Sequence, residues 1–164
     1  MSEFTEKART GTRTTPAKTG KYLTFSLGDE SYGIGILMVK EIIGLMPITS
    51  IPRAPEYLKG VINLRGKVIP VIDLRLKFSM SSIPYSVRTC IIVIETETDS
   101  GTVLNGIVVD AVSEVLNISK DEIEETPDFG SKLNTVYILG MAKKESGIKI
   151  LLDIQVVLNH KNTE

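Results

Sequence analysis

Residues 60–74 read GVINLRGKVIPVIDL, in which two apolar runs, at 61–64 and 68–74, flank an Arg-Gly-Lys turn. Short runs rich in β-branched residues that meet at a glycine-containing turn are typical of a β-hairpin. Pro70 lies inside the second run and has no backbone N–H to donate to a neighbouring strand. We therefore expect that strand to have an edge, a bulge or a change of partner at Pro70.

Alternation of apolar and polar residues recurs on both sides of this stretch. Further strand pairs are expected at 22–27 with 31–36, 89–95 with 103–109, and 136–141 with 147–152. The first of these pairs alternates regularly, which predicts one buried face. The chain also has 20 Ile and 14 Val against 15 Leu and 5 Ala, and β-branched side chains favour strands over helices. About eight to ten short strands separated by turns predict a mostly β protein built as small barrels or a sandwich.

Three local signals refine this outline. Pro55 suits a first helical position and Gly60 suits a left-handed C-terminal cap, which predicts one helical turn between them. Residues 48–51 are expected to form another strand. Asp153 is expected to cap a short C-terminal helix.

The chain is expected to consist of one folded domain with short tails. Residues 1–20 contain six threonines and little that can be buried, so we expect a disordered N-terminal tail. The folded domain is predicted at 21–160, and residues 161–164 are expected to form a C-terminal tail.

Composition excludes several classes of protein. The 19 Lys and Arg nearly balance the 20 Asp and Glu, giving a formal net charge of −1, which disfavours nucleic-acid binding by bulk charge. No apolar run approaches the ~18–20 residues that a membrane span needs, so we expect no direct membrane insertion. One cysteine, Cys90, and one histidine, His160, cannot form an internal disulfide or a Cys/His zinc cage. No metal or other cofactor is expected, and the protein is predicted to be cytoplasmic.

The motifs tested for catalysis are weak. His160 lies beyond the last apolar helical position, where a catalytic base would not be held rigidly. The Asp-Ser-Gly at 99–101 resembles an aspartic-protease motif but reads better as a hairpin turn. Asp73, Asp110 and Asp153 each end an apolar strand. Capping of the following turn is favoured for them, and a convergent carboxylate cluster in an enzyme stays open as an alternative.

Two polar residues, Asn63 and Arg65, interrupt the apolar stretch at 60–74. An arginine on a tight turn between buried strands is rigidly presented and offers a planar fork to a partner carboxylate. Glu41 is similar, since it lies beside an apolar strand face. A simple solvated surface charge is the competing interpretation for both Arg65 and Glu41.

These motifs, in their order along the chain, resemble the CheW-like domain family. The resemblance covers residues 21 to about 158. It rests on YGI at 32–34, VKEII at 39–43, PRAPEYLKG at 52–60, VINLRG at 61–66, VIPVIDL at 68–74, VVDAVSEVL at 108–116 and ILLD at 150–153.

The resemblance implies two interlocked five-stranded, SH3-like barrels with short helices and a non-catalytic adaptor function. Such an adaptor bridges the histidine kinase CheA, through its regulatory domain, and the cytoplasmic tips of methyl-accepting chemotaxis receptors, and it is recruited to membrane-associated receptor arrays. The resemblance also implies receptor binding through Arg65, Glu41, Gly60 and Asn63. It assigns no kinase-binding residues, although the kinase is expected to dock at the barrel ends.

A nucleic-acid-binding small barrel is the alternative function. It requires a basic face with stacked aromatic side chains. The net charge of −1 and the total of 5 Tyr and 4 Phe count against it.

Overall fold

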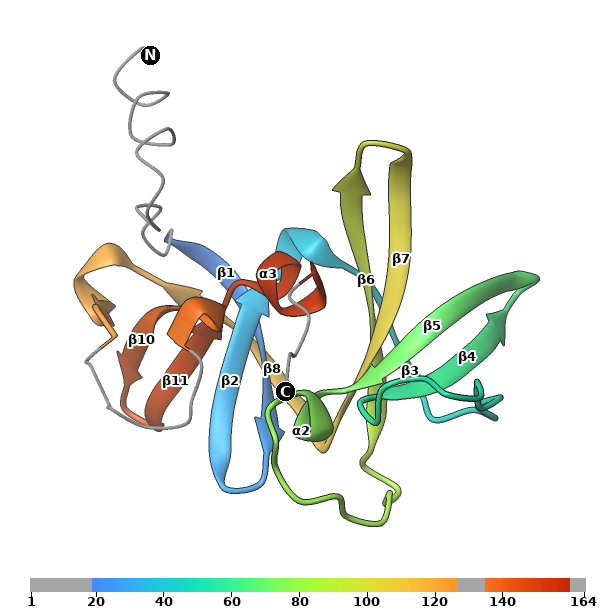
Figure 1. The fold of residues 1–164 in the computed structure, drawn as a ribbon. Helices are drawn as coiled ribbons and strands as arrows, with labels where there is room; N and C mark the ends of the chain where they lie inside the picture. The colour runs from blue at the N-terminus through green and yellow to red at the C-terminus, as the bar shows by residue number, and fades with distance from the viewer. Residues whose placement is uncertain (1–18, 127–134, 160–164) are drawn as a thin grey trace.

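The computed structural model describes residues 19–126 and 135–159, which form two β-sheets and a few short helices (Figure 1). The first sheet has six strands in the order β8-β1-β2-β11-β10-β9, and the second has five in the order β3-β6-β7-β5-β4. The first sheet consists of β1 (Gly20–Leu27), β2 (Glu30–Gly35), β8 (Ala111–Ile118), β9 (Ile123–Glu124), β10 (Ile138–Lys144) and β11 (Gly147–Leu152). The second consists of β3 (Val39–Gly44), β4 (Leu58–Leu64), β5 (Lys67–Asp73), β6 (Cys90–Thr98) and β7 (Gly101–Val109). The helices are η1 (Ile36–Met38), α2 (Leu74–Lys77), η2 (Lys120–Glu122), η3 (Thr135–Tyr137) and α3 (Ile154–Asn159), the η elements being 3-10 turns.

The two sheets are interlocked by the path of the chain. β1 and β2 belong to the first sheet, η1 leads to β3, and all five strands of the second sheet then follow in succession. The chain returns to the first sheet at Asp110, the single residue between β7 and β8. The expected mostly β fold with two SH3-like barrels is confirmed. The first sheet has, beyond five longer strands, the two-residue strand β9.

The second sheet closes on itself although β3 and β4 are its two edges. Thr49 forms an isolated bridge with Val61 of β4, with N–H···O distances of 2.9 Å in both directions. Closure shields an edge that otherwise presents unpaired backbone groups. The strand expected at 48–51 is wrong, because only this single bridge forms. Pro47 and Pro52 flank the segment and supply no N–H to extend a ladder.

The two barrels share the largest of three hydrophobic clusters among the described residues. A row of aromatic rings runs through it, with centroid distances of 5.9 Å between Phe25 and Tyr32, 6.1 Å between Tyr32 and Phe78, and 5.4 Å between Phe78 and Tyr137. Phe78 follows α2 in the part of the chain that builds the second sheet, whereas Phe25 and Tyr32 lie on β1 and β2. Aromatic pairs of this kind contribute about 0.5–1.5 kcal/mol each beyond the burial of their area, so the row holds the two barrels together.

β1 is buried on both faces, so the expectation of one buried face is wrong. Leu23 and Phe25 pack in the shared core, whereas Tyr22 packs with Ile118 and Leu151 in a separate cluster. Successive side chains of β1 point to opposite faces of the sheet, and both faces are covered, so β1 contributes to two clusters at once.

The local signals have mixed outcomes. Of the three features expected at Pro70, β5 has an edge there, because β4 pairs with it from Lys67 to Ile72 whereas pairing with β7 on the other side begins only at Val71. The helical turn expected between Pro55 and Gly60 is wrong, since β4 already begins at Leu58. The capped C-terminal helix is confirmed as α3, where Val156 N–H donates to Asp153 Oδ1 at 3.4 Å. The proposed tails lie outside the described residues except for Thr19 and Gly20, as does His160.

Candidate partner-binding site

The turn between β4 and β5 holds Arg65 in a left-handed backbone conformation. Arg65 has φ 49° and Gly66 has φ 90°, the pattern of a two-residue type I′ hairpin turn. The Asn63 side chain accepts a hydrogen bond from Gly66 N–H at 2.8 Å. Asn63 thus fixes the turn, and the turn presents the side chain of Arg65.

Arg65 and Glu41, both predicted as binding residues, contact one another. Arg65 Nη2 donates to Glu41 Oε1 at 2.7 Å and to Oε2 at 2.8 Å. β3 and β4 are opposite edges of the second sheet, so the pair also joins the two ends of the barrel wall. The side chain of Arg65 is 69% exposed, and an exposed ion pair stabilises a fold by only about 0–1 kcal/mol. Its main consequence is to orient the guanidinium.

Gly60, the third predicted binding residue, is buried. Its φ is +146°, and a Cβ at this position would lie 2.0 Å from Thr49 O. No side chain fits there, since the opposing atom belongs to the backbone of the segment that closes the barrel. The structure thus gives Gly60 a role in the closure of the barrel by Thr49.

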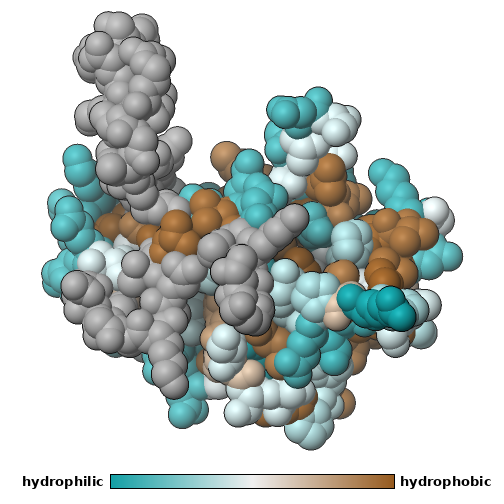
Figure 2. All heavy atoms as spheres, in the orientation of Figure 1, coloured by the Kyte–Doolittle hydropathy of each residue, from teal (hydrophilic) through white to brown (hydrophobic). Residues whose placement is uncertain are grey.

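An apolar groove lies where η1 meets β1 and α3. It has a volume of about 350 Å³. Its apolar lining comes from Tyr22, Ile36, Leu37, Met38, Leu139, Leu152 and Ile154. Leu37 is 96% exposed, an unusual setting for a large apolar side chain in a short helix. Figure 2 shows hydrophobic residues next to hydrophilic ones on the face of the molecule that it draws.

Sequence reasoning did not single out Leu37. The available signal was the unbroken apolar run at 36–39, which departs from the alternation before it. A strand with one buried face does not need four apolar residues in succession, so one of them had to face solvent or a partner.

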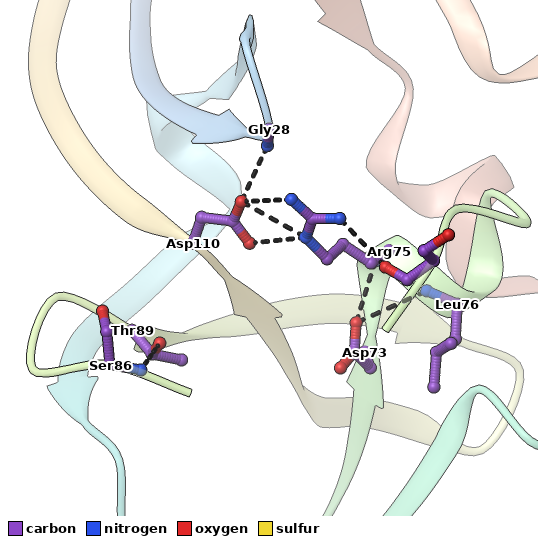
Figure 3. Close-up of polar contacts among 8 residues, drawn as sticks. Gly28, Asp73, Arg75, Leu76, Ser86, Thr89 and Asp110 are labelled. Atoms are coloured by element: carbon purple, nitrogen blue, oxygen red, sulfur yellow. Dashed lines mark hydrogen bonds and ion pairs between the residues drawn. The ribbon is translucent and has the colours of Figure 1, made fainter. Parts of the chain in front are cut away.

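The strand-end carboxylates do not converge on a reactive centre. Asp73 is buried and caps α2, accepting from Arg75 N–H at 2.9 Å and from the Tyr85 hydroxyl at 2.7 Å. Asp110 instead binds the guanidinium of Arg75 (Figure 3). Asp153 caps α3. Among the described residues, no three His, Cys, Asp or Glu side chains are placed to hold a metal ion.

Two pKa values reflect these environments. Burial raises the pKa of Tyr85, and its hydrogen bond to Asp73 raises it further. Burial also acts to raise the pKa of Asp110. The hydrogen bonds from Arg75 and from Gly28 N–H outweigh this effect and hold that pKa below its usual range. Asp110 therefore stays ionised at neutral pH.

Comparison with known proteins identifies the family. Residues 21–162 match the family model of the CheW-like domain. The chain belongs to the CheW-like domain family. It is 41% identical over 139 residues to the chemotaxis protein CheW of Klebsiella aerogenes, covering 85% of this chain and 81% of that protein. It is 34% identical over 142 residues to the chemotaxis protein CheW of Rhizobium meliloti, covering 87% of this chain and 89% of that protein.

A solved CheW structure has the same fold. The crystal structure of the scaffolding protein TtCheW from Thermoanaerobacter tengcongensis matches with a TM-score of 0.76 and 35% identity, over 89% of this chain and 97% of that chain. The CheW-like family is thus one of chemotaxis adaptors and scaffolds. In the described part of this chain, every helix is too short or too polar to cross a membrane.

Proposed function

We propose that this protein is a chemotaxis coupling adaptor that links the histidine kinase CheA to the cytoplasmic tips of methyl-accepting chemoreceptors. Membership of the CheW-like family supports the chemotaxis role. The observation that carries the receptor-binding part is the presentation of Arg65, which a type I′ turn holds in place and Glu41 orients. Such an adaptor makes no covalent change in its partners and is recruited to membrane-associated receptor arrays.

Arg65 is prepared for an acidic partner. Both oxygens of Glu41 accept from Nη2, while Nε and Nη1 of Arg65 have no partner within the described residues. Charge-assisted hydrogen bonds from a guanidinium to a carboxylate are about twice as strong as neutral ones. A receptor carboxylate accepts from Nε or from Nη1, which lie on different edges of the guanidinium, without displacing Glu41 from Nη2. The apolar groove beside Leu37 receives the hydrophobic face of the receptor helices.

The kinase regulatory domain docks at the barrel ends. Val68 beside the β4–β5 turn is 71% exposed, and Ile148 beside the β10–β11 turn is 56% exposed. Figure 1 places these two hairpins at opposite sides of the molecule. Two different docking patches make heterologous contacts, which extend into rings or arrays. Several modest contacts together then supply tight binding.

The alternative of a nucleic-acid-binding barrel gains no support. Stacking of bases requires exposed aromatic rings. The phenylalanine and tyrosine side chains within 19–126 and 135–159 are all buried or half-buried.

The test is a binding titration with a purified receptor signalling fragment and the purified kinase. Arg65→Ala is expected to weaken receptor binding about tenfold, since a hydrogen bond to a charged group contributes ~1.5–3 kcal/mol. Kinase binding should stay unchanged. Ile148→Glu should show the opposite pattern. Glu145→Ala, on the equivalent turn of the other hairpin, is the matched control and should bind both partners normally. Unchanged receptor affinity in Arg65→Ala would contradict the proposed site.

A further inference from the structure

Asp110 marks a crossing between the two barrels. Within the described residues the chain passes between the sheets twice, once through η1 and once at Asp110. The backbone N–H of Asp110 donates to Ser26 O at 3.1 Å, and its Oδ2 accepts from Gly28 N–H at 2.7 Å. Asp110 is thus attached to the β1–β2 hairpin of the first barrel through both its backbone and its side chain.

Arg75 reaches Asp110 from the second barrel. It lies on α2, directly after β5. Its Nε donates to Asp110 Oδ1 at 3.0 Å and its Nη2 to Oδ2 at 2.9 Å, a two-point contact (Figure 3). Its Nη1 donates to Ser81 O at 2.9 Å. One guanidinium therefore joins α2, the chain crossing and the connection that leads to β6.

This contact is the most enclosed ion pair among the described residues. The side chains of Arg75 and Asp110 are 12% and 21% exposed, and an enclosed pair is screened little by salt. The other pairs each join elements of a single sheet or its adjoining turns. They are Lys40–Glu95, Arg65–Glu41, Lys143–Glu124 and Lys144–Glu122. Within the described chain, only Arg75–Asp110 spans the two barrels.

We propose that Arg75 is a positioning residue for signal transmission, because its contact with Asp110 adds, at the chain crossing, a charged restraint to the relative orientation that the shared core sets for the two barrels. This inference rests on the proposed adaptor function. A shift imposed on the Arg65 turn in the second barrel reaches the kinase contact at Ile148 of the first barrel only if the two barrels move as one body. Loosening the contact uncouples the partners while both docking surfaces, which do not include Arg75 or Asp110, stay intact.

The variants are Arg75→Gln and Asp110→Asn, with Lys144→Gln as the matched control. Asp110→Asn keeps the shape of the side chain and an oxygen for Gly28 N–H. It removes the charge, and it replaces the oxygen that accepts from Arg75 Nε with an NH2 group that can only donate. Lys144→Gln removes a partly buried ion pair of similar exposure, 21% and 32%, that lies within the first barrel. If the loss of any partly buried ion pair lowered kinase activation, Lys144→Gln would lower it as much as Arg75→Gln does.

Kinase activation in a reconstituted mixture of receptor fragment, kinase and adaptor is the first measurement. We expect both variants to bind receptor and kinase separately within about twofold of the parent protein and to lower activation at least about fivefold, the low end of a typical coupling free energy. Lys144→Gln should activate normally. Full activation with folded Asp110→Asn overturns the inference. Failure of the parent protein to bind either partner instead contradicts the proposed function, so the two failures are distinguishable.

A distance measurement on the isolated protein is the second readout and needs no partner. Spin labels are attached at Val68→Cys in the second barrel and Ile148→Cys in the first, in a Cys90→Ala background. The distribution of label distances should broaden in Arg75→Gln and stay narrow in Lys144→Gln. An unchanged distribution in Arg75→Gln overturns the inference, and if that variant does not fold, the same outcome in Asp110→Asn does so.

Discussion

The β4–β5 hairpin and the β10–β11 hairpin have the same framework in different barrels. The carbonyls of Tyr57 and Tyr137 accept hydrogen bonds of 2.8 Å from Asp73 N–H and Asp153 N–H, respectively. The second strand of each hairpin pairs in parallel with a strand from elsewhere, β7 for β5 and β2 for β11. The terminal aspartate then caps α2 or α3. Folding alone explains these shared features.

The two turns differ in both conformation and charge. The first turn has positive φ at Arg65 and Gly66. The second confines its positive φ to Gly147, where glycine has no steric penalty. Arg65 and Glu145 occupy equivalent places, since the residues before them pair across the turn in both hairpins. A left-handed arginine is unfavourable by about 1–2 kcal/mol, so Arg65 is not the residue that the stability of the turn alone favours.

Both barrels nonetheless use an ion pair next to the turn. Arg65 contacts Glu41 in the second barrel. In the first, Lys144 donates to Glu122 Oε2 and to Asn117 O, both at 2.9 Å. The first pair comes from the tip of the turn and is open to solvent, whereas the second comes from the strand. The comparison therefore separates a turn that presents charge from one that only closes a barrel.

The largest expected loss of stability comes from pushing the β4–β5 hairpin away from Thr49, in the segment that closes the second barrel. Gly60→Ala places a Cβ 2.0 Å from Thr49 O, and strained, overpacked sites of this kind cost about 3–5 kcal/mol. Urea unfolding measures the loss. Gly66→Ala is the control, since its φ is +90° with no atom nearby, and it should cost only about 1 kcal/mol. Equal losses in the two variants would contradict the close approach at Gly60.

The aspartates that cap α2 and α3 should contribute differently to the free energy of unfolding, which is a second difference between the two hairpins. Asp73 is 3% exposed and also accepts from the hydroxyl of Tyr85 at 2.7 Å. Its removal in Asp73→Ala leaves buried donors unpaired and should cost about 2–4 kcal/mol. Asp153 is only half-buried, and Asp153→Ala should cost ~1 kcal/mol, as for a typical N-cap. Thermal unfolding of the two variants side by side checks the order, and the reverse order would contradict it.

Much of the framework could be predicted from the sequence because its signals are local. Hairpins follow from alternation and turn residues, as at Arg65-Gly66. The unpaired edge of β5 at Pro70 follows from a missing N–H, and the cap at Asp153 follows from its place before a helical run. Gly60 was misassigned because a glycine suits a helix cap and a close backbone approach equally well, and only the packing of Thr49 distinguishes them.

The ion pairs that orient Arg65 and that connect the two barrels could not be predicted from such local signals. Glu41 and Arg65 are 24 residues apart, and Arg75 and Asp110 are 35 apart. No periodicity relates such residues, because their proximity depends on how the sheets close and cross. The sequence indicated that Arg65 was exceptional without indicating that Glu41 was its partner. Arg75 carried no signal, since an arginine after a strand is usually solvated.

The smallest expected change in stability is that of Arg65→Asn, which distinguishes the role of Arg65 in receptor binding from its role in the fold. Asn-Gly is the preferred pair for a type I′ turn, so Arg65→Asn should keep the turn and raise the free energy of unfolding by ~0.5–1 kcal/mol, measured by urea unfolding. The same variant removes the guanidinium and should weaken receptor binding as much as Arg65→Ala does. Arg65→Lys, which keeps a charge but loses the planar fork, should lie between Asn and the parent in receptor affinity and match the parent in stability. A variant that is more stable but binds receptor less well would assign the left-handed arginine to binding. If Arg65→Asn lowers stability, the ion pair with Glu41 contributes more to the barrel than its exposure indicates, and the contrast between the two turns is then structural.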